Sequence, residues 1–270
     1  MTNPARFLFR GLNAARWQIR SLILNLFCDS LLSWGTKIGV SGNFRARMLW
    51  KAGRRDIVSV PVLHDYMEQE KAQGQYYASA PAWSSRSQTI INLLAPHISK
   101  EARILEIGCN SGRNLNHLWR AGYKALCGIE ISKHAAKRLR RTYQCLAHVP
   151  IDIGPAEDLI RKFSNHSIDV IFTMAMLEHL HPDNKFLFKE IARVASNYVL
   201  AVESRLGKRS HMQYPWDIKG EFAAVGLTCI EVKPWSALWP GELTAENEWT
   251  DDLHEYDAFL FAISCPDTNA

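Results

Sequence analysis

The sequence predicts an α/β fold in which a mostly parallel, doubly wound sheet of seven strands carries helices on both faces. Between residues 102 and 202, short apolar strands alternate with helical segments, a pattern that forms right-handed βαβ units. Two further strands, 227–232 and 258–264, follow with no crossover helix between them, which predicts an antiparallel terminal strand in a hairpin at the sheet edge. At 270 residues and 47% hydrophobic content, the chain can bury a sizeable core.

A basic, helical arm and connector is predicted over residues 1–75, ahead of the α/β domain at 76–270. Residues 1–60 contain ten Lys or Arg and two Asp, a formal net charge of +8, which leaves −3 for the rest of a chain whose total is +5. Such an arm suits an anionic partner, either membrane lipid or nucleic acid, and a solvated helical face would explain the same charges.

Apolar residues interleave with the basic ones in this arm and leave two arrangements open. One is an amphipathic helix in peripheral contact with a membrane through residues 1–40, and the other is a helical cap packed on the domain or on a partner subunit. A transmembrane span is not expected, because Asn25 and Asp29 would lie in its middle, where Asp costs about 3 kcal/mol. A signal peptide is not expected either, because the apolar run is interrupted and no cleavage site follows.

The six cysteines have neither metal-ligand nor disulfide spacing, so no metal site and a cytoplasmic location are expected, with membrane association through the arm left open.

Proline, glycine and serine residues mark the ends of several predicted helices of the domain. A helix over 84–97 ends near Pro96, and the helix after Gly112 ends near Gly122, a residue type that commonly follows a helix. Ser132 caps a basic helix whose charges are expected to face solvent. A turn and a short helix fill 154–159, and a helix through 186–194 precedes the fifth strand. The five strands are 102–107, 125–131, 147–153, 167–174 and 198–202.

Glycines and carboxylates follow three successive strands. The loop 108–112 follows the first, Glu130 ends the second, and Ala156 and Glu157 follow the third. In such sheets ligands bind beyond the carboxyl ends of the strands. Taken alone, Glu130 is consistent with an exposed strand end. Glu157 is consistent with an acidic residue in the first turn of a helix, where the helix dipole favours it. Their order and spacing together predict a bound adenosine-type cofactor.

The glycine loop identifies the type of cofactor. A nicotinamide site favours G-x-G-x-x-G, but Asn110 and Arg113 occupy its second and third glycine positions. The E-x-G-x-N-x-G form instead resembles motif I of class I S-adenosylmethionine-dependent methyltransferases, a Rossmann-like fold. Asn110 departs from the commoner glycine there but tolerates a positive φ. The resemblance covers about residues 76–265 and extends to 128–130, 154–159, 169–173, 177–180 and the terminal hairpin.

Within that family the chain is most similar to the small-molecule methyltransferases that include the ubiquinone-biosynthesis enzymes. The resemblance implies S-adenosyl-L-methionine as cofactor, with the ribose on Glu130 and the amino group near Glu106. The full set of cofactor-binding residues that it implies is Tyr77, Arg86, Glu106, Gly108, Asn110, Gly112, Glu130, Ala156, Glu157, Thr173 and Met174.

Catalysis and acceptor recognition are less sharply indicated. His179 is the candidate general base, with His181 and His211 as second choices, and a purely structural role for His179 fits as well. The acceptor is expected to meet the arm and the segments 205–220 and 235–249. We expect transfer to oxygen of a small-molecule or a lipid- or saccharide-linked acceptor.

Methylation of nitrogen, carbon or RNA is the alternative, and so is a non-catalytic, membrane-docked protein that binds the cofactor. Nucleic acid is not the expected partner, because no N-P-P-Y motif is present and the basic arm alone is thin support. The sequence does not indicate an oligomeric state.

Overall fold

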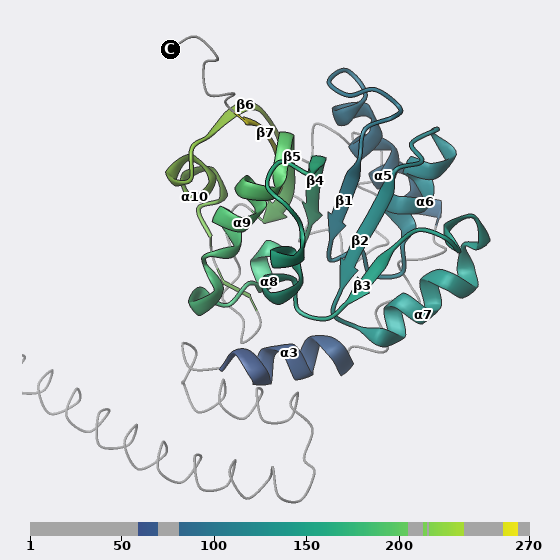
Figure 1. The fold of residues 1–270 in the computed structure, drawn as a ribbon, viewed down its shortest axis with the longest axis horizontal. Coiled ribbons are helices and arrows are strands. Elements are labelled where there is room, and N and C mark those ends of the chain that lie inside the picture. The colour runs from purple at the N-terminus through teal and green to yellow at the C-terminus, as the bar shows by residue number, and fades with distance from the viewer. Residues whose placement is uncertain (1–58, 70–80, 205–212, 215, 235–255, 264–270) are drawn as a thin grey trace, which may run out of the picture. The chain divides into compact units, whose positions relative to one another are not determined.

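A seven-stranded sheet in the order β3-β2-β1-β4-β5-β7-β6 forms the centre of the molecule (Figure 1). The computed structural model describes residues 59–69, 81–204, 213–214, 216–234 and 256–263. Strands β1 to β5 are mutually parallel, and β7 is antiparallel to both of its neighbours. The strands are β1 Ile104–Ile107, β2 Leu126–Glu130, β3 Ile151–Ile153, β4 Ile168–Met174, β5 Ala195–Ser204, β6 Leu227–Pro234 and β7 Tyr256–Ile263. The predicted fold class is confirmed.

The helices connect the strands as predicted crossovers and cover both faces of the sheet (Figure 1). The α-helices are α3 Val60–Gln69, α5 Pro81–Leu94, α6 Arg113–Arg120, α7 Lys133–Thr142, α8 Ala156–Leu159, α9 Leu187–Val194 and α10 Ile218–Ala224. Four 3₁₀ helices complete the described elements: Gln144–Leu146, Ile160–Lys162, Leu177–His179 and Pro182–Asn184.

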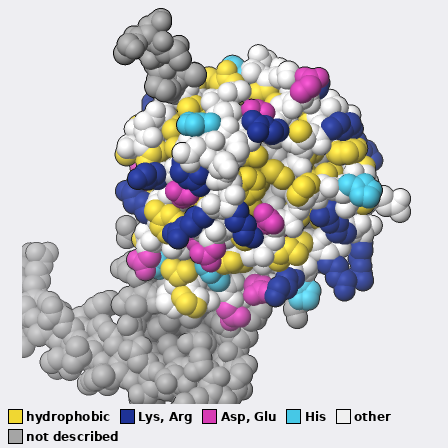
Figure 2. Space-filling view, in the orientation of Figure 1, with side chains coloured by type: hydrophobic (Ala, Val, Ile, Leu, Met, Phe, Trp, Pro, Cys, Tyr) yellow, Lys and Arg dark blue, Asp and Glu magenta, His cyan; other side chains and the backbone are white. Residues whose placement is uncertain are grey.

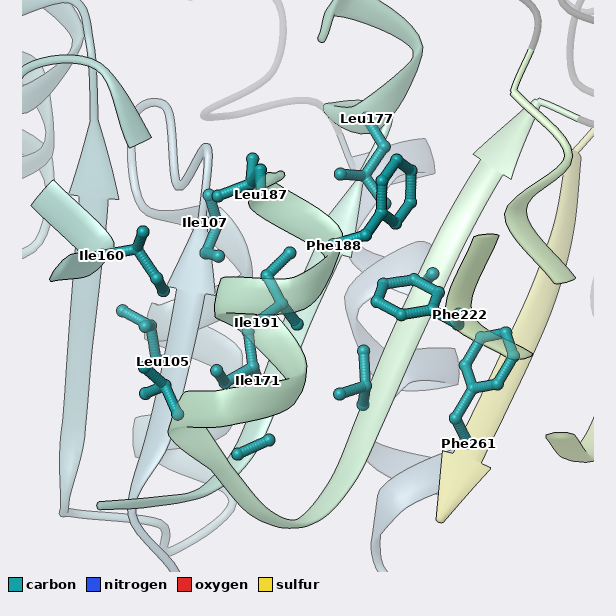
Figure 3. Close-up of a cluster of buried hydrophobic side chains, with 14 of the residues drawn as sticks. Leu105, Ile107, Ile160, Ile171, Leu177, Leu187, Phe188, Ile191, Phe222 and Phe261 are labelled. Carbon is teal, nitrogen blue, oxygen red and sulfur yellow. The ribbon is translucent and has the colours of Figure 1, made fainter. Parts of the chain in front are cut away.

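Each face of the sheet has its own core, because alternate residues of a strand point to opposite sides. In β4, Val170 and Phe172 join the cluster under α5 and α6, whereas Ile171 joins the cluster under α9. Figure 3 shows the second cluster, in which Phe188 of α9 and Phe222 of α10 lie over the sheet. Burial on both faces explains why the parallel strands read as continuous apolar runs.

Strand β3 is shorter than predicted. The expected strand 147–153 begins only at Ile151, because a 3₁₀ helix and a turn precede it. In that turn the guanidinium of Arg140 donates hydrogen bonds to the carbonyls of Leu146, Ala147 and Val149. A side chain therefore satisfies backbone acceptors that a neighbouring strand would otherwise have to pair.

Helix α7 keeps most of its predicted basic face in solvent. Lys133, Lys137 and Arg141 are exposed, and Figure 2 shows Lys and Arg side chains gathered over this helix. Arg140 is the exception, since it turns towards the carbonyls before β3.

The terminal hairpin is confirmed, but its order in the sheet differs from a simple edge addition. β7 lies between β5 and β6, with Leu200 opposite Leu260 and Thr228 opposite Ala262. The last described strand is thus an interior strand, with Leu260 and Phe261 buried. Helix α10 was not predicted; its first three residues, 218–220, lie in the segment 205–220 that is expected to meet the acceptor.

Most of the predicted arm, residues 1–58 and 70–75, lies outside the described residues. Helix α3 agrees with the helix expected within the connector. No helix among the described residues is long and apolar enough to cross a membrane. The predicted domain boundary near residue 75 and the roles of the arm stay predictions.

Because the central strands are buried on both faces, an Ile→Ala substitution there should lower the free energy of unfolding far more than the same substitution on an edge strand. Ile171→Ala removes a fully buried side chain at the centre of β4 and should lower the free energy of unfolding by about 2–5 kcal/mol. Ile230→Ala, on edge strand β6 with 46% of the residue exposed, should cost less than about 1 kcal/mol. Urea unfolding of both variants measures the difference, and equal losses would contradict the assignment of β4 to the core.

Candidate cofactor site

The loop between β1 and α6 takes the unusual backbone conformation that its sequence predicts. Gly108, Asn110 and Gly112 all have positive φ angles, of 78°, 46° and 77°. Asparagine is one of the few residue types with a side chain that adopts this region readily, so Asn110 replaces a glycine without loss of the turn. The backbone N–H groups of Gly108 and Cys109 both donate to the carbonyl of Ile129, which ties the loop to β2.

Gly112 needs its lack of a side chain for packing as well as for its φ angle. A Cβ at this position would lie 2.5 Å from Cγ of Leu139 in α7. Gly108 is similarly close to the turn after β4, because a Cβ there would lie 2.8 Å from Cγ of Met176. The two glycines therefore let the loop approach α7 and the β4 turn at the same time.

Glu130, the last residue of β2, holds two loops together through its carboxylate. Oε2 accepts the N–H of Asn110 at 2.7 Å, and Oε1 accepts the N–H of Ser132 at 2.8 Å. The residue is 6% exposed. A carboxylate oxygen can accept more than one hydrogen bond.

Glu106 lies one residue before the end of β1 and is 2% exposed. Its Oε1 accepts a hydrogen bond from Nδ2 of Asn114 at 2.7 Å, and Oδ1 of Asn114 accepts one from Oγ of Ser87 at 2.7 Å. Its Oε2 is buried with no hydrogen-bond partner among the described residues. Burial raises the pKa of Glu106 to about 8, against the opposing effects of Asn114 and Arg113.

The residues expected to read an adenine lie beyond β3. Ala156 and Glu157 begin α8 and are both buried. The carboxylate of Glu157 accepts a hydrogen bond from Nδ2 of Asn184, which comes from the segment after β4. Because β3 adjoins β2 in the sheet, these residues follow a strand next to the one that carries Glu130.

The turn after β4 contains a residue with a strained backbone conformation, and hydrogen bonds hold it in place. Thr173 is fully buried, and Met174 is half-buried with its sulfur 3.7 Å from Nδ2 of Asn114. Ala175 follows with φ of +51°, a conformation that costs an L-residue with a Cβ about 1–2 kcal/mol. The N–H of Met176 donates to both carboxylate oxygens of Glu203 at the end of β5, at 3.1 and 3.2 Å. Strain of this kind concentrates at functional sites.

His179 lies in the 3₁₀ helix after β4, beside a second buried carboxylate. Its Nε2 is 3.5 Å from Oε1 of Glu178, and its side chain is 31% exposed. Glu178 in turn accepts the hydroxyl of Tyr256, the first residue of β7, at 2.8 and 2.9 Å. Burial and the neighbouring Glu178 raise the pKa of Glu203 to about 8.

The structure brings the predicted cofactor residues to one edge of the sheet, except where the chain is not described. Those of the β1 loop, β2, the β3 turn and β4 all follow the carboxyl ends of adjacent strands. Arg86 is buried on α5, next to Ser87. Tyr77 and His211 lie outside the described residues, as does most of the segments 205–220 and 235–249.

His181, a second choice for the general base, and Trp216, from the segment 205–220 expected to meet the acceptor, have contacts that hold the turn after β4. Nδ1 of His181 accepts the N–H of Asp183. Nε1 of Trp216 donates to the carbonyl of Leu180 at 3.1 Å, and its ring packs edge-on against Phe188. Trp216 is therefore half-buried, not the exposed aromatic that an acceptor surface requires.

Sequence reasoning missed the contacts of Ser87, Asn114, Glu178 and Tyr256. Ser87 and Asn114 are 27 positions apart, and Glu178 and Tyr256 are 78 apart, so only the folded chain joins them. Asn114 alone carried a signal, as a polar residue in the first turn of a helix that follows a ligand loop.

The electrostatics of this edge are dominated by buried carboxylates. Five glutamates less than 9% exposed lie there: Glu106, Glu130, Glu157, Glu178 and Glu203. The half-buried Arg113 acts on Glu106, and Arg86 is buried on α5. Among the described residues, no three His, Cys, Asp or Glu side chains converge as metal ligands.

Comparison with known proteins finds that part of this chain is similar to methyltransferases. Residues 105–198 match the family described as "Methyltransferase domain". The chain is also 30% identical over 130 residues to the tRNA U34 carboxymethyltransferase of Cellvibrio japonicus. That alignment covers 44% of this chain and 39% of the relative, so the chain spans less than half of the curated protein that it matches.

Solved structures share the fold at low sequence identity. Magnesium protoporphyrin IX methyltransferase from Synechocystis with bound S-adenosylmethionine superimposes with a TM-score of 0.56 at 14% identity, covering 76% of this chain and 96% of that one. Phosphoethanolamine N-methyltransferase 2 of Haemonchus contortus gives 0.56 at 14%, covering 75% and 60%. The [4+2]-cyclase SpnF gives 0.53 at 14%, covering 69% and 86%.

Fold and family match together define the class of protein. The sheet order, the loop after β1 and the matched domain are those of a class I methyltransferase. Residues 105–198 match a methyltransferase domain, and the surrounding fold is that of solved S-adenosylmethionine-dependent methyltransferases. Since a cyclase shares the fold, the fold by itself does not name the reaction or its acceptor.

Because Leu139 lies close to Gly112, a side chain at this position should lower the free energy of unfolding by more than the positive φ angle alone would. Gly112→Ala should lower the free energy of unfolding by about 1–2 kcal/mol for the positive φ and by a further 1 kcal/mol or so for the clash with Leu139. Gly226→Ala is the matched control, because its φ is +90° and a Cβ there meets nothing within 4 Å. Chemical unfolding that gave equal losses for the two variants would show that Gly112 matters only for its backbone angle.

Proposed function

We propose that this protein transfers the methyl group of S-adenosylmethionine to an oxygen of a small-molecule or a lipid- or saccharide-linked acceptor. The observation that carries the cofactor part is the carboxylate of Glu130, fixed between two loops by the N–H groups of Asn110 and Ser132. A rigid carboxylate at the end of β2 suits the two adjacent hydroxyls of a ribose.

The charge of the site supports a cationic cofactor. Five buried glutamates lie at the carboxyl edge of the sheet, and burial raises the pKa of two of them, Glu106 and Glu203, to about 8. A positive group of a ligand beside such carboxyls favours their charged forms. Glu106 adds a specific partner, since its buried Oε2 has no hydrogen-bond partner among the described residues. An unpaired buried carboxyl oxygen is costly, and an ammonium group beside it would satisfy it. The residues present therefore fit S-adenosylmethionine.

Positioning is the main contribution of the chain to the reaction. S-adenosylmethionine supplies, when bound, a methyl group on a sulfonium that is open to in-line displacement. Glu130, Glu106 and the β1 loop fix the adenosine and amino-acid parts, and the strained turn at Ala175 fixes the wall of the site after β4. Holding two reactants in line converts a bimolecular step into an effectively unimolecular one.

His179 is the residue that we propose takes the proton of a hydroxyl acceptor. Its Nε2 faces the carboxylate of Glu178, which Tyr256 holds in place from the other side. That pairing would leave Nδ1 as the basic nitrogen, in the same way that a carboxylate orients a catalytic imidazole.

Loss of the Glu130 carboxylate should weaken cofactor binding sharply. Glu130→Ala removes the proposed ribose acceptors and leaves two loop N–H groups without their partner, so the dissociation constant for S-adenosylhomocysteine should rise about 100-fold. Glu221→Ala, which removes a carboxylate paired with Lys185 far along the chain in α10, should leave it unchanged. Calorimetry that found equal affinity in Glu130→Ala and the unsubstituted chain would refute the site.

The proposed base can be tested once a screen with labelled cofactor yields an acceptor. His179→Gln should lower the turnover rate about 100-fold or more while the affinity for S-adenosylhomocysteine stays the same. His134→Gln, on the exposed side of α7, is the control and should leave both unchanged. Normal turnover in His179→Gln would assign His179 to the structure of the turn instead.

RNA is a second candidate acceptor, and one observation favours it. The curated relative from Cellvibrio japonicus acts on tRNA, as its name states, and is 30% identical over 130 residues. The same labelled-cofactor screen separates the two proposals when it includes total tRNA beside small-molecule and lipid extracts. Label in tRNA alone would replace the small-molecule acceptor with RNA.

A further inference from the structure

Glu106 occupies an environment that no other carboxylate of the site shares. Glu130, Glu157, Glu178 and Glu203 each accept hydrogen bonds from backbone or side-chain donors outside their own strand. In Glu106, Oε1 accepts from Nδ2 of Asn114 and the backbone N–H of Leu115 also stabilises the carboxylate, but Oε2 has no hydrogen-bond partner among the described residues. Burial raises the pKa of both Glu106 and Glu203 to about 8, but Glu203 accepts the N–H of Met176 on both oxygens, whereas Oε2 of Glu106 has no hydrogen-bond partner among the described residues.

The hydrogen-bond chain around Asn114 determines which oxygen of Glu106 holds a proton. Oδ1 of Asn114 accepts from Oγ of Ser87 at 2.7 Å, so its amide is turned with Nδ2 towards Glu106. Arg113 reinforces this orientation, because its Nε donates to Oγ of Ser87 at 3.1 Å. Oε1 of Glu106 is therefore an acceptor in either protonation state, and a proton on this group lies on the buried Oε2.

The charged and titratable groups that face Glu106 act in opposite directions. Arg113 on α6 and the N–H of Leu115 favour the carboxylate, whereas Glu130 on β2 disfavours it. The thiol of Cys109 stays protonated, because burial and the two glutamates raise its pKa well above the ordinary value. Arg86 is the further buried charge on α5, and β4 presents the uncharged Met174. Burial outweighs the groups that favour the carboxylate and raises the pKa of Glu106 to about 8.

We propose that cofactor binding displaces a proton from Oε2 of Glu106, so that the Ser87–Asn114–Glu106 chain is a positioning device that exchanges a proton for the ammonium group of the amino-acid part. This rests on the proposed function. The proton passes to solvent, and no bond other than that O–H is broken. The free protein thereby keeps a neutral group at this buried position and acquires the counter-charge only when the ligand supplies its partner.

The direction of the pH dependence follows from the raised pKa. Below about pH 8 most of the free protein carries the proton, and binding an ammonium must release it. Affinity should therefore rise with pH, by up to about tenfold per unit, between roughly pH 6 and 7.5, where an α-ammonium group still keeps its own charge.

Calorimetry on the full chain tests this with two ligands. S-adenosylhomocysteine should bind more tightly as the pH rises from about 6 to 7.5, and buffers of different ionisation enthalpy should report release of up to about one proton. 5′-Methylthioadenosine has the adenosine part without the amino acid, so it should bind with little pH dependence. The comparison needs no substitution and so does not depend on the folding of a variant.

Glu106→Gln provides the matched variant, because glutamine keeps the shape and cannot exchange the proton. Its affinity for S-adenosylhomocysteine should be nearly constant with pH and should match the unsubstituted chain near pH 6. An equal pH slope in both chains, or equal proton release with both ligands, would overturn the proton exchange and leave the proposed function standing. Failure of both ligands to bind at any pH would overturn the two proposals together.

Discussion

The carboxylate of Glu130 is the constraint on which the cofactor site depends. It joins the loop after β1 to the turn after β2, through the N–H groups of Asn110 and Ser132. A buried carboxylate is stable only when its oxygens are satisfied, so the two loops and the charge hold one another in place. The positive φ angles at Gly108 and Asn110 are needed for the loop to present an N–H to that carboxylate. The same fixed oxygens are those that suit a ribose.

A second consequence of the topology is the gathering of carboxylates at one edge. Parallel strands end at the same edge of a sheet, so glutamates at the ends of β1, β2 and β5 lie along one edge although the sequence separates them widely. Each is stabilised differently: Glu130 and Glu203 accept backbone N–H groups, Glu178 accepts the hydroxyl of Tyr256, and Glu106 accepts the side-chain amide of Asn114 on Oε1 while its Oε2 has no hydrogen-bond partner among the described residues. On the proposed proton exchange, Glu130 is a fixed anchor, whereas the charge of Glu106 responds to the ligand.

Much of the fold was predictable because strands that are buried on both faces are continuous apolar runs in the sequence. Strands β1, β2 and β4 appear as apolar runs, and the glycine loop marks where β1 ends. Three features of the fold have no comparable sequence pattern. β3 starts late because Arg140 takes up carbonyls before it, β7 enters between β5 and β6, and α10 is short. The cofactor residues were predictable from their place at strand ends, whereas the partners of Glu106 and Glu178 depend on contacts between distant segments.

The central claim is that the carboxyl edge of β1, β2 and β3 binds the adenosine of S-adenosylmethionine. A crystal structure of the full chain with S-adenosylhomocysteine tests it most directly. The account predicts both ribose hydroxyls on the carboxylate of Glu130, the amino group within hydrogen-bond distance of Oε2 of Glu106, and the adenine beside Ala156. An adenosine bound elsewhere, or a ribose that leaves Glu130 in contact only with Asn110 and Ser132, would contradict it.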